Sequence, residues 1–197
     1  MIQFCKEYTM PKVITDLQIF LAVIETIAER GYAGATTRQI AEAAKVSEVT
    51  LFRKYGTKAE LVKRAINALI EQSNFESSTQ YTGDIRADLL RILQAYQEAV
   101  ILHGRFFFVI FAELNRAPEL ADSFSQPLGL FQSIGKLLMR YQTESVLKSE
   151  NHLHSVASLL GPLIYFSMIS HSVGGASMPP MDAEAHVRHF LEGRLAS

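Results

Sequence analysis

Apolar side chains recur at helical spacing along the whole chain, and no stretch of useful length shows the two-residue alternation of a strand. Residues 13–30 carry one apolar stripe, and Gly31 follows where a helix favours a left-handed C-cap. The same spacing predicts later helices over residues 84–104, 106–115 and 153–172, a long one that breaks at Pro127, and a last one capped by Asp182. This pattern predicts an all-α protein with about nine helices.

Short helices with clear N-terminal signals follow the first stripe. A Thr-Thr-Arg-Gln capping box begins a helix over 37–44, Ser47 is a suitable N-cap for a helix over 48–54, and a Thr-Lys-Ala-Glu box at Thr57 begins a helix that reaches about residue 72. Because a very short segment separates the two short helices, they must cross steeply. That crossing is the geometry of a helix-turn-helix.

Charge is concentrated on the same segment. Residues 36–64 hold seven Lys or Arg and three Asp or Glu, a local charge of +4 in a chain whose net charge is −1. A basic patch on an otherwise acidic protein indicates a localised phosphate-binding surface. The single cysteine, Cys5, cannot form a disulfide within the chain, so we expect a reducing, cytoplasmic compartment.

Residues 30–62 resemble the DNA-binding signature of the TetR repressor family. The resemblance rests on Gly31-Tyr32 after the first helix, Thr36-Thr37 at the start of the second, Val46-Ser47 in the turn, Thr50-Leu51-Phe52 in the recognition helix and Lys58 in the fourth. It implies an N-terminal three-helix domain for operator DNA and a C-terminal helical domain for ligand sensing and dimerisation. The expected parts are a tail, the helix-turn-helix domain, a connecting helix with linker, and the sensing domain, over residues 1–12, 13–56, 57–83 and 84–197.

The resemblance also implies roles for individual residues. Arg53 is the best candidate for bidentate guanine readout, and Lys58 for a phosphate contact from the fourth helix. Lys45 stands where the turn usually has Gly, and Phe52 stands where a Tyr hydroxyl usually meets phosphate. The DNA-binding residues implied are Thr37, Arg38, Lys45, Ser47, Glu48, Val49, Thr50, Phe52, Arg53, Lys54 and Lys58. For Glu48, a first-turn acid that stabilises the helix dipole is an equally good interpretation.

Aromatic and apolar side chains of the C-terminal part are candidates for an effector pocket, because ligand pockets are mostly apolar. Each of them could equally be ordinary core. The pocket residues that we expect are Tyr96, His103, Phe107, Phe111, Phe131, Met139, Tyr165, Met168 and His171.

Residues 155–181 contain no Lys, Arg, Asp or Glu. The stretch is interrupted by Gly161-Pro162 and by serines, which disfavours a membrane span. We expect instead that its helix is covered inside a bundle or at a subunit interface, where it and the last helix pair with their copies in a two-fold four-helix contact. The expected interface residues are Val156, Leu160, Leu163, Ser167, His171, Val187, Phe190 and Leu191.

Other functions fit the sequence less well. The pairs His152/His154 and His186/His189 lack the further ligands that a metal site needs, and no cofactor is expected. An all-helical enzyme would leave the basic helix-turn-helix unexplained, and the chain has no glycine-rich phosphate loop or nucleophile elbow. A regulator controlled by a protein partner stays open. A solvent-filled aromatic cavity would favour a small ligand, whereas a solid core with an apolar groove would favour the partner.

Overall fold

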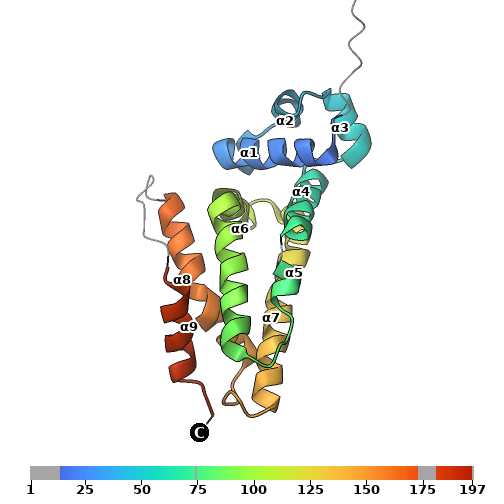
Figure 1. Ribbon diagram of the computed structural model, residues 1–197. Helices are drawn as coiled ribbons and strands as arrows, with labels where there is room; N and C mark the ends of the chain where they lie inside the picture. The colour runs from blue at the N-terminus through green and yellow to red at the C-terminus, as the bar shows by residue number, and fades with distance from the viewer. Residues whose placement is uncertain (1–13, 74, 173–180, 197) are drawn as a thin grey trace, which may run out of the picture.

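The structure is a computed structural model that describes residues 14–73, 75–172 and 181–196, with the side chains of His171 and Ser172 left out (Figure 1). Within these residues it is built from helices, which confirms the predicted all-α class. The α-helices are α1 (Asp16–Gly34), α2 (Thr37–Ala43), α3 (Glu48–Tyr55), α4 (Lys58–Gln72), α5 (Phe75–Ser78), α6 (Ile85–Glu113), α7 (Ser125–Thr143), α8 (His152–Ser172) and α9 (Ala183–Glu192). A 3₁₀ helix, η1 (Pro118–Phe124), precedes α7.

Side-chain caps set the starts of the N-terminal helices. The Thr36 hydroxyl accepts a hydrogen bond from the Gln39 backbone N–H, and the Gln39 side chain accepts one from the Thr36 N–H, as the capping box predicts. Thr57 caps α4 in the same way through Glu60 N–H, at 3.1 Å. The reciprocal half of that box was predicted wrongly, because the Glu60 carboxylate pairs with Arg64 at 2.9 Å instead.

Two predicted helix boundaries differ from the structure. The expected break near Gly104 is absent, and α6 runs unbroken from Ile85 to Glu113. A glycine inside a helix costs only about 1 kcal/mol. The burial of Leu93 before this glycine, and of Phe106 and Ile110 after it, outweighs that cost. Pro127 does not break a long helix either. It lies in the first turn of α7, where a missing N–H removes no helical hydrogen bond.

The molecule has two hydrophobic cores. In Figure 1, the helices α1–α3 that contribute to the first (the upper core) lie above the helices α5, α7, α8 and α9 that contribute to the second (the lower core). The upper core joins α1–α4 to the C-terminal half of α6 and to η1, through Phe106, Ile110 and Leu120. The lower core joins the N-terminal half of α6 to α5, α7, α8 and α9. Because α6 and η1 contribute to the upper core, the helix-turn-helix is packed on the C-terminal bundle rather than tethered to it.

Helix α8 is buried along one side only. Over 152–170 it has a mean hydropathy of 1.4 with 28% of the residues buried, so by length and composition it could cross a membrane, a test that core helices of soluble proteins also pass. Its exposed side carries Leu153 and Tyr165, which are 58% and 60% exposed. An apolar helix face of this kind calls for a covering surface.

Most residues that we expected at a subunit interface point the other way. Val156, Leu160 and Leu163 of α8, and Val187, Phe190 and Leu191 of α9, are all buried in the lower core of one chain. These six are therefore corrected to core residues, since buried side chains cannot contact a second copy. Ser167 lines a cavity, described below. The side chain of His171 lies outside the described residues.

Candidate nucleic-acid interface and cavity

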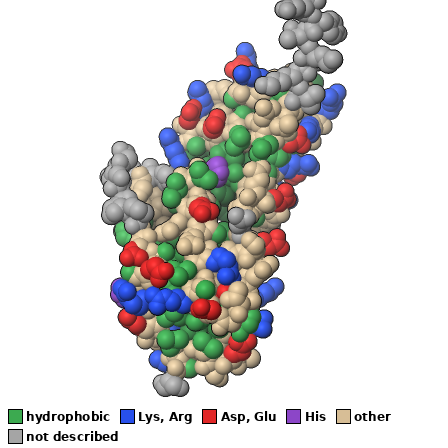
Figure 2. Space-filling view, in the orientation of Figure 1, with side chains coloured by type: hydrophobic (Ala, Val, Ile, Leu, Met, Phe, Trp, Pro, Cys, Tyr) green, Lys and Arg blue, Asp and Glu red, His purple; other side chains and the backbone are tan. Residues whose placement is uncertain are grey.

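The recognition helix α3 lies at the end of the molecule farthest from the C-terminal bundle (Figure 1). Its inner side is anchored by Leu51 and Tyr55, which are buried against α1 and α4. Its outer side presents Val49 and Phe52, 75% and 72% exposed. Figure 2 shows Lys and Arg side chains around this end of the molecule. A helix that exposes both apolar and cationic side chains has the composition needed to enter a DNA groove.

The turn between α2 and α3 is tight and locally strained. Lys45 has φ of 57°, in the left-handed region that favours glycine, as its position in the motif predicts. Val46 N–H then donates to Ala41 O at 3.0 Å, and Ser47 caps α3 by accepting from Thr50 N–H at 3.1 Å. These bonds fix the angle at which α3 leaves α2.

The Lys and Arg side chains near α3 differ in whether they form ion pairs. Arg53 is exposed and has no hydrogen bond or ion pair with the residues that the structure describes. Lys54 pairs with Asp16 at the start of α1, and Arg38 pairs with Glu42 at 3.0 Å on an exposed face. Exposed pairs of this kind contribute little, so a phosphate could replace either carboxylate.

Glu48 is held in place by a neighbour across the turn. The Thr37 hydroxyl donates to the Glu48 carboxylate, which joins the N-terminus of α2 to that of α3. Both residues are among those predicted to touch DNA, and the structure brings them together at the outer end of the motif. The contact gives Glu48 a structural role in the free protein.

Lys58, predicted to reach a phosphate, faces inward in this structure. Its Nζ donates to Tyr32 O at 2.6 Å and to Ala35 O at 3.1 Å, and it lies 3.9 Å from the centre of the Tyr32 ring. Burial lowers the pKa of Lys58 below its ordinary value. The ammonium therefore ties the start of α4 to the end of α1, and its contact with DNA stays a prediction.

Tyr32 continues this junction into the C-terminal part. Its hydroxyl donates to Glu119 Oε1 of η1 at 3.3 Å, and burial followed by the nearby Glu119 charge raises the pKa of Tyr32 to about 12. The hydroxyl stays protonated at neutral pH and remains a donor. A continuous set of contacts thus runs from α4 through Tyr32 to η1.

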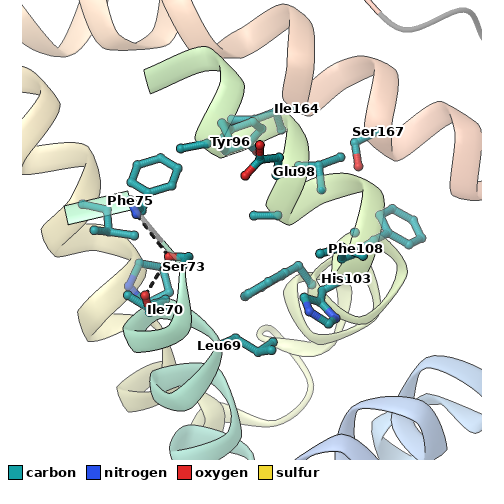
Figure 3. Close-up of a pocket in the computed structure, with 18 of the residues that line it drawn as sticks. Leu69, Ile70, Ser73, Phe75, Tyr96, Glu98, His103, Phe108, Ile164 and Ser167 are labelled. Atoms are coloured by element: carbon teal, nitrogen blue, oxygen red, sulfur yellow. Dashed lines mark hydrogen bonds between the residues drawn. The ribbon is translucent and has the colours of Figure 1, made fainter. Parts of the chain in front are cut away.

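A cavity of about 480 Å³ lies between the two cores (Figure 3). Its walls come from α4, α5, α6, η1, α7 and α8, and they are mostly apolar. Phe124, the last residue of η1, and Pro127 of α7 are part of the lining, so the cavity touches the same 3₁₀ helix that holds Glu119. A volume of this size lies within the usual range for small-molecule sites.

Six of the predicted pocket residues line this cavity: Tyr96, His103, Phe107, Phe111, Phe131 and Met168. Met139 and Tyr165 do not; they are 45% and 60% exposed elsewhere on α7 and α8. Helical spacing places a residue on a face but does not say which face meets a cavity, and this is why both were misplaced. Sequence reasoning also missed Leu69 and Ile70 of α4, whose apolar spacing looks like ordinary core.

The polar groups of the lining are few. Burial lowers the pKa of His103, which is therefore a neutral imidazole at neutral pH. Burial also raises the pKa of Tyr96 to about 12. No hydrogen bond of His103, Tyr96 or Glu98 side chains is formed within the described part of the chain. These groups are available to a molecule in the cavity.

No cluster of His, Cys, Asp and Glu among the described residues could hold a metal ion. His186 is engaged instead, with Nε2 at 2.8 Å from Leu159 O. The histidine pairs singled out in the sequence therefore do not come together as a binding site in this part of the structure.

The N-terminal region matches known regulators. A sequence profile of bacterial regulatory proteins of the tetR family matches residues 19–65. An HTH-type transcriptional regulator of Bacillus subtilis, YvkB, is 41% identical over 81 residues, which are 40% of this chain and 41% of that protein. An HTH-type transcriptional regulator of Mycobacterium bovis is 29% identical over 107 residues, 54% of this chain and 52% of that protein. The chain thus spans about half the length of the curated relatives that it matches.

Solved structures resemble the whole fold. A Mesorhizobium loti protein named as a TetR-family transcriptional regulator superposes with a TM-score of 0.72 at 18% identity, over 92% of this chain and 96% of the other. A TetR family transcription regulator from Marinobacter aquaeolei gives 0.69 at 15% identity, over 92% and 96%. The flavonoid-responsive regulator FrrA gives 0.63 at 19% identity, over 91% and 97%. At these identities the likeness concerns the fold alone.

Proposed function

This chain belongs to the TetR family of bacterial regulatory proteins, and on that premise we propose that it is a homodimeric repressor that leaves its operator when a small, largely apolar ligand binds the cavity. Its partners are then double-stranded operator DNA, a second copy and the ligand, and it acts in the bacterial cytoplasm. The observation that carries the proposal is the outer side of α3, where Arg53 is unpaired among the described residues and Val49 and Phe52 are exposed.

DNA recognition divides between two kinds of contact. Arg53 reads a base edge, and Val49 and Phe52 offer apolar contact to thymine methyl groups. Lys45, Lys54 and the N-terminus of α2 around Thr37 and Arg38 meet phosphates, which position the helix without reading sequence. Val49 and Phe52 support this assignment, because exposed apolar residues on a short helix have no other evident partner in the described structure.

The dimer forms through the exposed side of α8. Leu153, Ala157, Tyr165 and Phe166 are all exposed, and space is open around Gly161 for a close helix approach. A two-fold dimer places two α3 helices in successive major grooves, about 34–36 Å apart, so the operator is a near-palindrome. This face replaces the buried residues that the sequence had indicated.

Ligand binding reaches the DNA-binding helices through η1. The cavity is lined by Phe124 of η1, and Glu119 of the same helix accepts the Tyr32 hydroxyl beside Lys58. A ligand that displaces η1 changes how α1 and α4 are held, and so changes the spacing of the two α3 helices. By thermodynamic linkage, operator DNA must lower the affinity of the protein for the ligand by the same factor. The aromatic cavity supports a small-molecule effector over a protein partner.

The test of DNA recognition uses purified protein and the promoter DNA next to its own gene, with footprinting to find the site and fluorescence anisotropy to measure affinity. Arg53→Ala should cost about 1–3 kcal/mol on the operator and relax one base position, while non-specific DNA binds as before. Arg86→Ala is the matched control, because Arg86 is an exposed arginine of α6, outside the helix-turn-helix, and is paired with Glu184. Equal losses on operator and random DNA would show that Arg53 is not a base reader.

A further inference from the structure

We propose that the cavity selects aromatic molecules that carry a basic or cationic nitrogen, and that it rejects organic anions. This inference rests on the proposed function, since it names the chemical class of the effector of that same cavity. Three features carry it: the charge of the lining, its unpaired polar groups and its aromatic walls.

The charge of the lining has one sign. Glu98 is the single charged side chain among the described residues that line the cavity, and no Lys or Arg belongs to the set. An anionic ligand would therefore lose water without gaining a cation, which is unfavourable for a buried charge.

Uncharged polar side chains also line the cavity, namely Gln72, Ser73, Tyr96, His103 and Ser167. Tyr96 and His103 both lie on α6, seven residues apart in number and hence on the same face, roughly 10 Å along the helix. Figure 3 shows both, with Glu98, among the labelled residues of the lining. A neutral imidazole can accept a hydrogen bond from a ligand N–H, and so can the Glu98 carboxylate. The His103 imidazole and the Glu98 carboxylate are therefore two acceptors that suit a ligand with an N–H group.

The walls are rich in aromatic rings. The rings come from several elements of the fold: Phe75, Tyr96, Phe107, Phe108, Phe111, Phe124 and Phe131. Ring faces attract cations, and offset or edge contacts between rings favour an aromatic ligand. An aliphatic acid would use neither property. A planar cation uses both, together with the carboxylate of Glu98.

The experiment compares three probes with the same three-ring skeleton and different charge: 9-aminoacridine (hereafter aminoacridine) as the cation, acridine as the uncharged molecule and acridine carboxylate as the anion. Calorimetric titration of the full chain at pH 7.5 should give affinities in that order, with the cation about twofold to fivefold tighter than the uncharged probe, as expected for one partly exposed carboxylate. Anion binding should be undetectable. Aminoacridine should also weaken operator binding by the wild type more than by Glu98→Gln, because direct intercalation of the dye into the DNA is the same for both proteins.

Charge variants test the assignment to Glu98. Glu98→Gln should remove the preference for aminoacridine over acridine while acridine binds as before, and Glu98→Lys should allow the carboxylate to bind. Glu71→Gln is the matched control, because Glu71 is an exposed acid of α4 that does not line the cavity. It removes the same charge and should leave all three affinities unchanged. Operator binding by each variant without ligand shows that the variant is folded.

The outcomes separate the two proposals. Acridine carboxylate binding as tightly as acridine, or an equal effect of Glu71→Gln and Glu98→Gln, would overturn the ligand class while the cavity remains an effector site. Failure of all three probes to bind would also overturn the ligand class. Failure of the unliganded protein to bind any operator would instead overturn the proposed function, and it is measured separately.

Discussion

Lys45 adopts a left-handed backbone conformation, with φ of 57°, although it carries a β-carbon. That conformation costs a non-glycine residue on the order of 1 kcal/mol, and glycine adopts it freely. The strain stands at a position where a cation can meet phosphate. Stability and DNA affinity should therefore respond in opposite directions to a change at this residue.

We expect Lys45→Gly to raise the free energy of unfolding by up to about 1 kcal/mol, because the turn strain is removed. The same change should weaken binding to operator and to random DNA alike. It should also lower the slope of log affinity against log salt concentration by about one unit. Urea unfolding at a fixed protein concentration and DNA titrations at several salt concentrations measure the two effects. A less stable variant would contradict the strain argument.

Asp88 is a fully buried carboxylate in the lower core. Thr82 donates to it through its N–H at 3.0 Å and its hydroxyl at 2.6 Å, and Tyr141 and Arg91 donate at 2.6 Å and 2.9 Å. Burial by itself raises the pKa of Asp88, but these hydrogen bonds outweigh it and hold the pKa below its ordinary value. The carboxylate fixes the loop before α6 to α7.

Asp88→Asn should lower the free energy of unfolding at pH 7 by about 2 kcal/mol, since a charge-assisted network loses its acceptor. A folded-state pKa below the unfolded value stabilises the fold at pH values above about 4, and that stabilisation is lost as the pH falls further. The difference in the free energy of unfolding between wild type and variant should therefore be smaller at pH 3 than at pH 7. Asp122→Asn, at an exposed acid of η1, is the control and should show neither effect.

At the scale of the helices, the capping residues in the sequence predicted where helices begin. The apolar spacing was a poorer guide to how far a helix continues. The structure places α2 and α3 within one residue of the predicted ends, because Thr36 and Ser47 cap them with their own side chains. The prediction of a break near Gly104 was wrong, because side chains of α6 pack into both cores and keep the helix continuous. Partners far apart in the sequence, such as Tyr32 and Glu119, carried no local signal at all.

The junction between η1 and α1 should control how strongly ligand and operator influence each other. Tyr32→Phe keeps the ring beside the Lys58 ammonium and removes only the hydroxyl that donates to Glu119. We expect it to change the coupling free energy by roughly 0.5–2 kcal/mol, toward weaker coupling. The measurement is the ratio of operator Kd with and without aminoacridine.

A control for this change exists at the other end of the molecule. Tyr81 also donates to a carboxylate, that of Glu144, far from the helix-turn-helix. Tyr81→Phe should leave the ratio of operator affinities unchanged. A loss of coupling in both variants, or in neither, would mean that the Tyr32 contact does not transmit the ligand signal.

At the scale of the whole molecule, the sequence indicated an apolar helix that needs a cover but not which of its sides is free. Helix α8 has apolar residues all round, so composition alone could not separate buried Leu160 from exposed Tyr165. Only the packing of α6, α7 and α9 against one side decides this. The sequence thus predicted the kind of surface and missed its residues.

A charge on the free side of α8 should separate the copies while each chain stays folded, because the side chain points away from the core. We expect Tyr165→Asp to be a monomer by light scattering at micromolar concentration. Its operator affinity should fall by roughly a hundredfold or more, because two linked recognition helices bind far more tightly than one. Its affinity for aminoacridine should persist, since Tyr165 does not line the cavity.

Ile101→Asp provides the comparison for this last change. Ile101 is an apolar residue of α6 that is 76% exposed and lies outside the cavity lining, so it tests whether any new surface charge has the same effect. If the dimer forms through α8, Ile101→Asp should remain dimeric and bind the operator as wild type does. A dimeric Tyr165→Asp protein would place the contact elsewhere. Because the operator argument requires two copies at a fixed spacing, the α3 helices would then have to be brought together by a different face of the molecule.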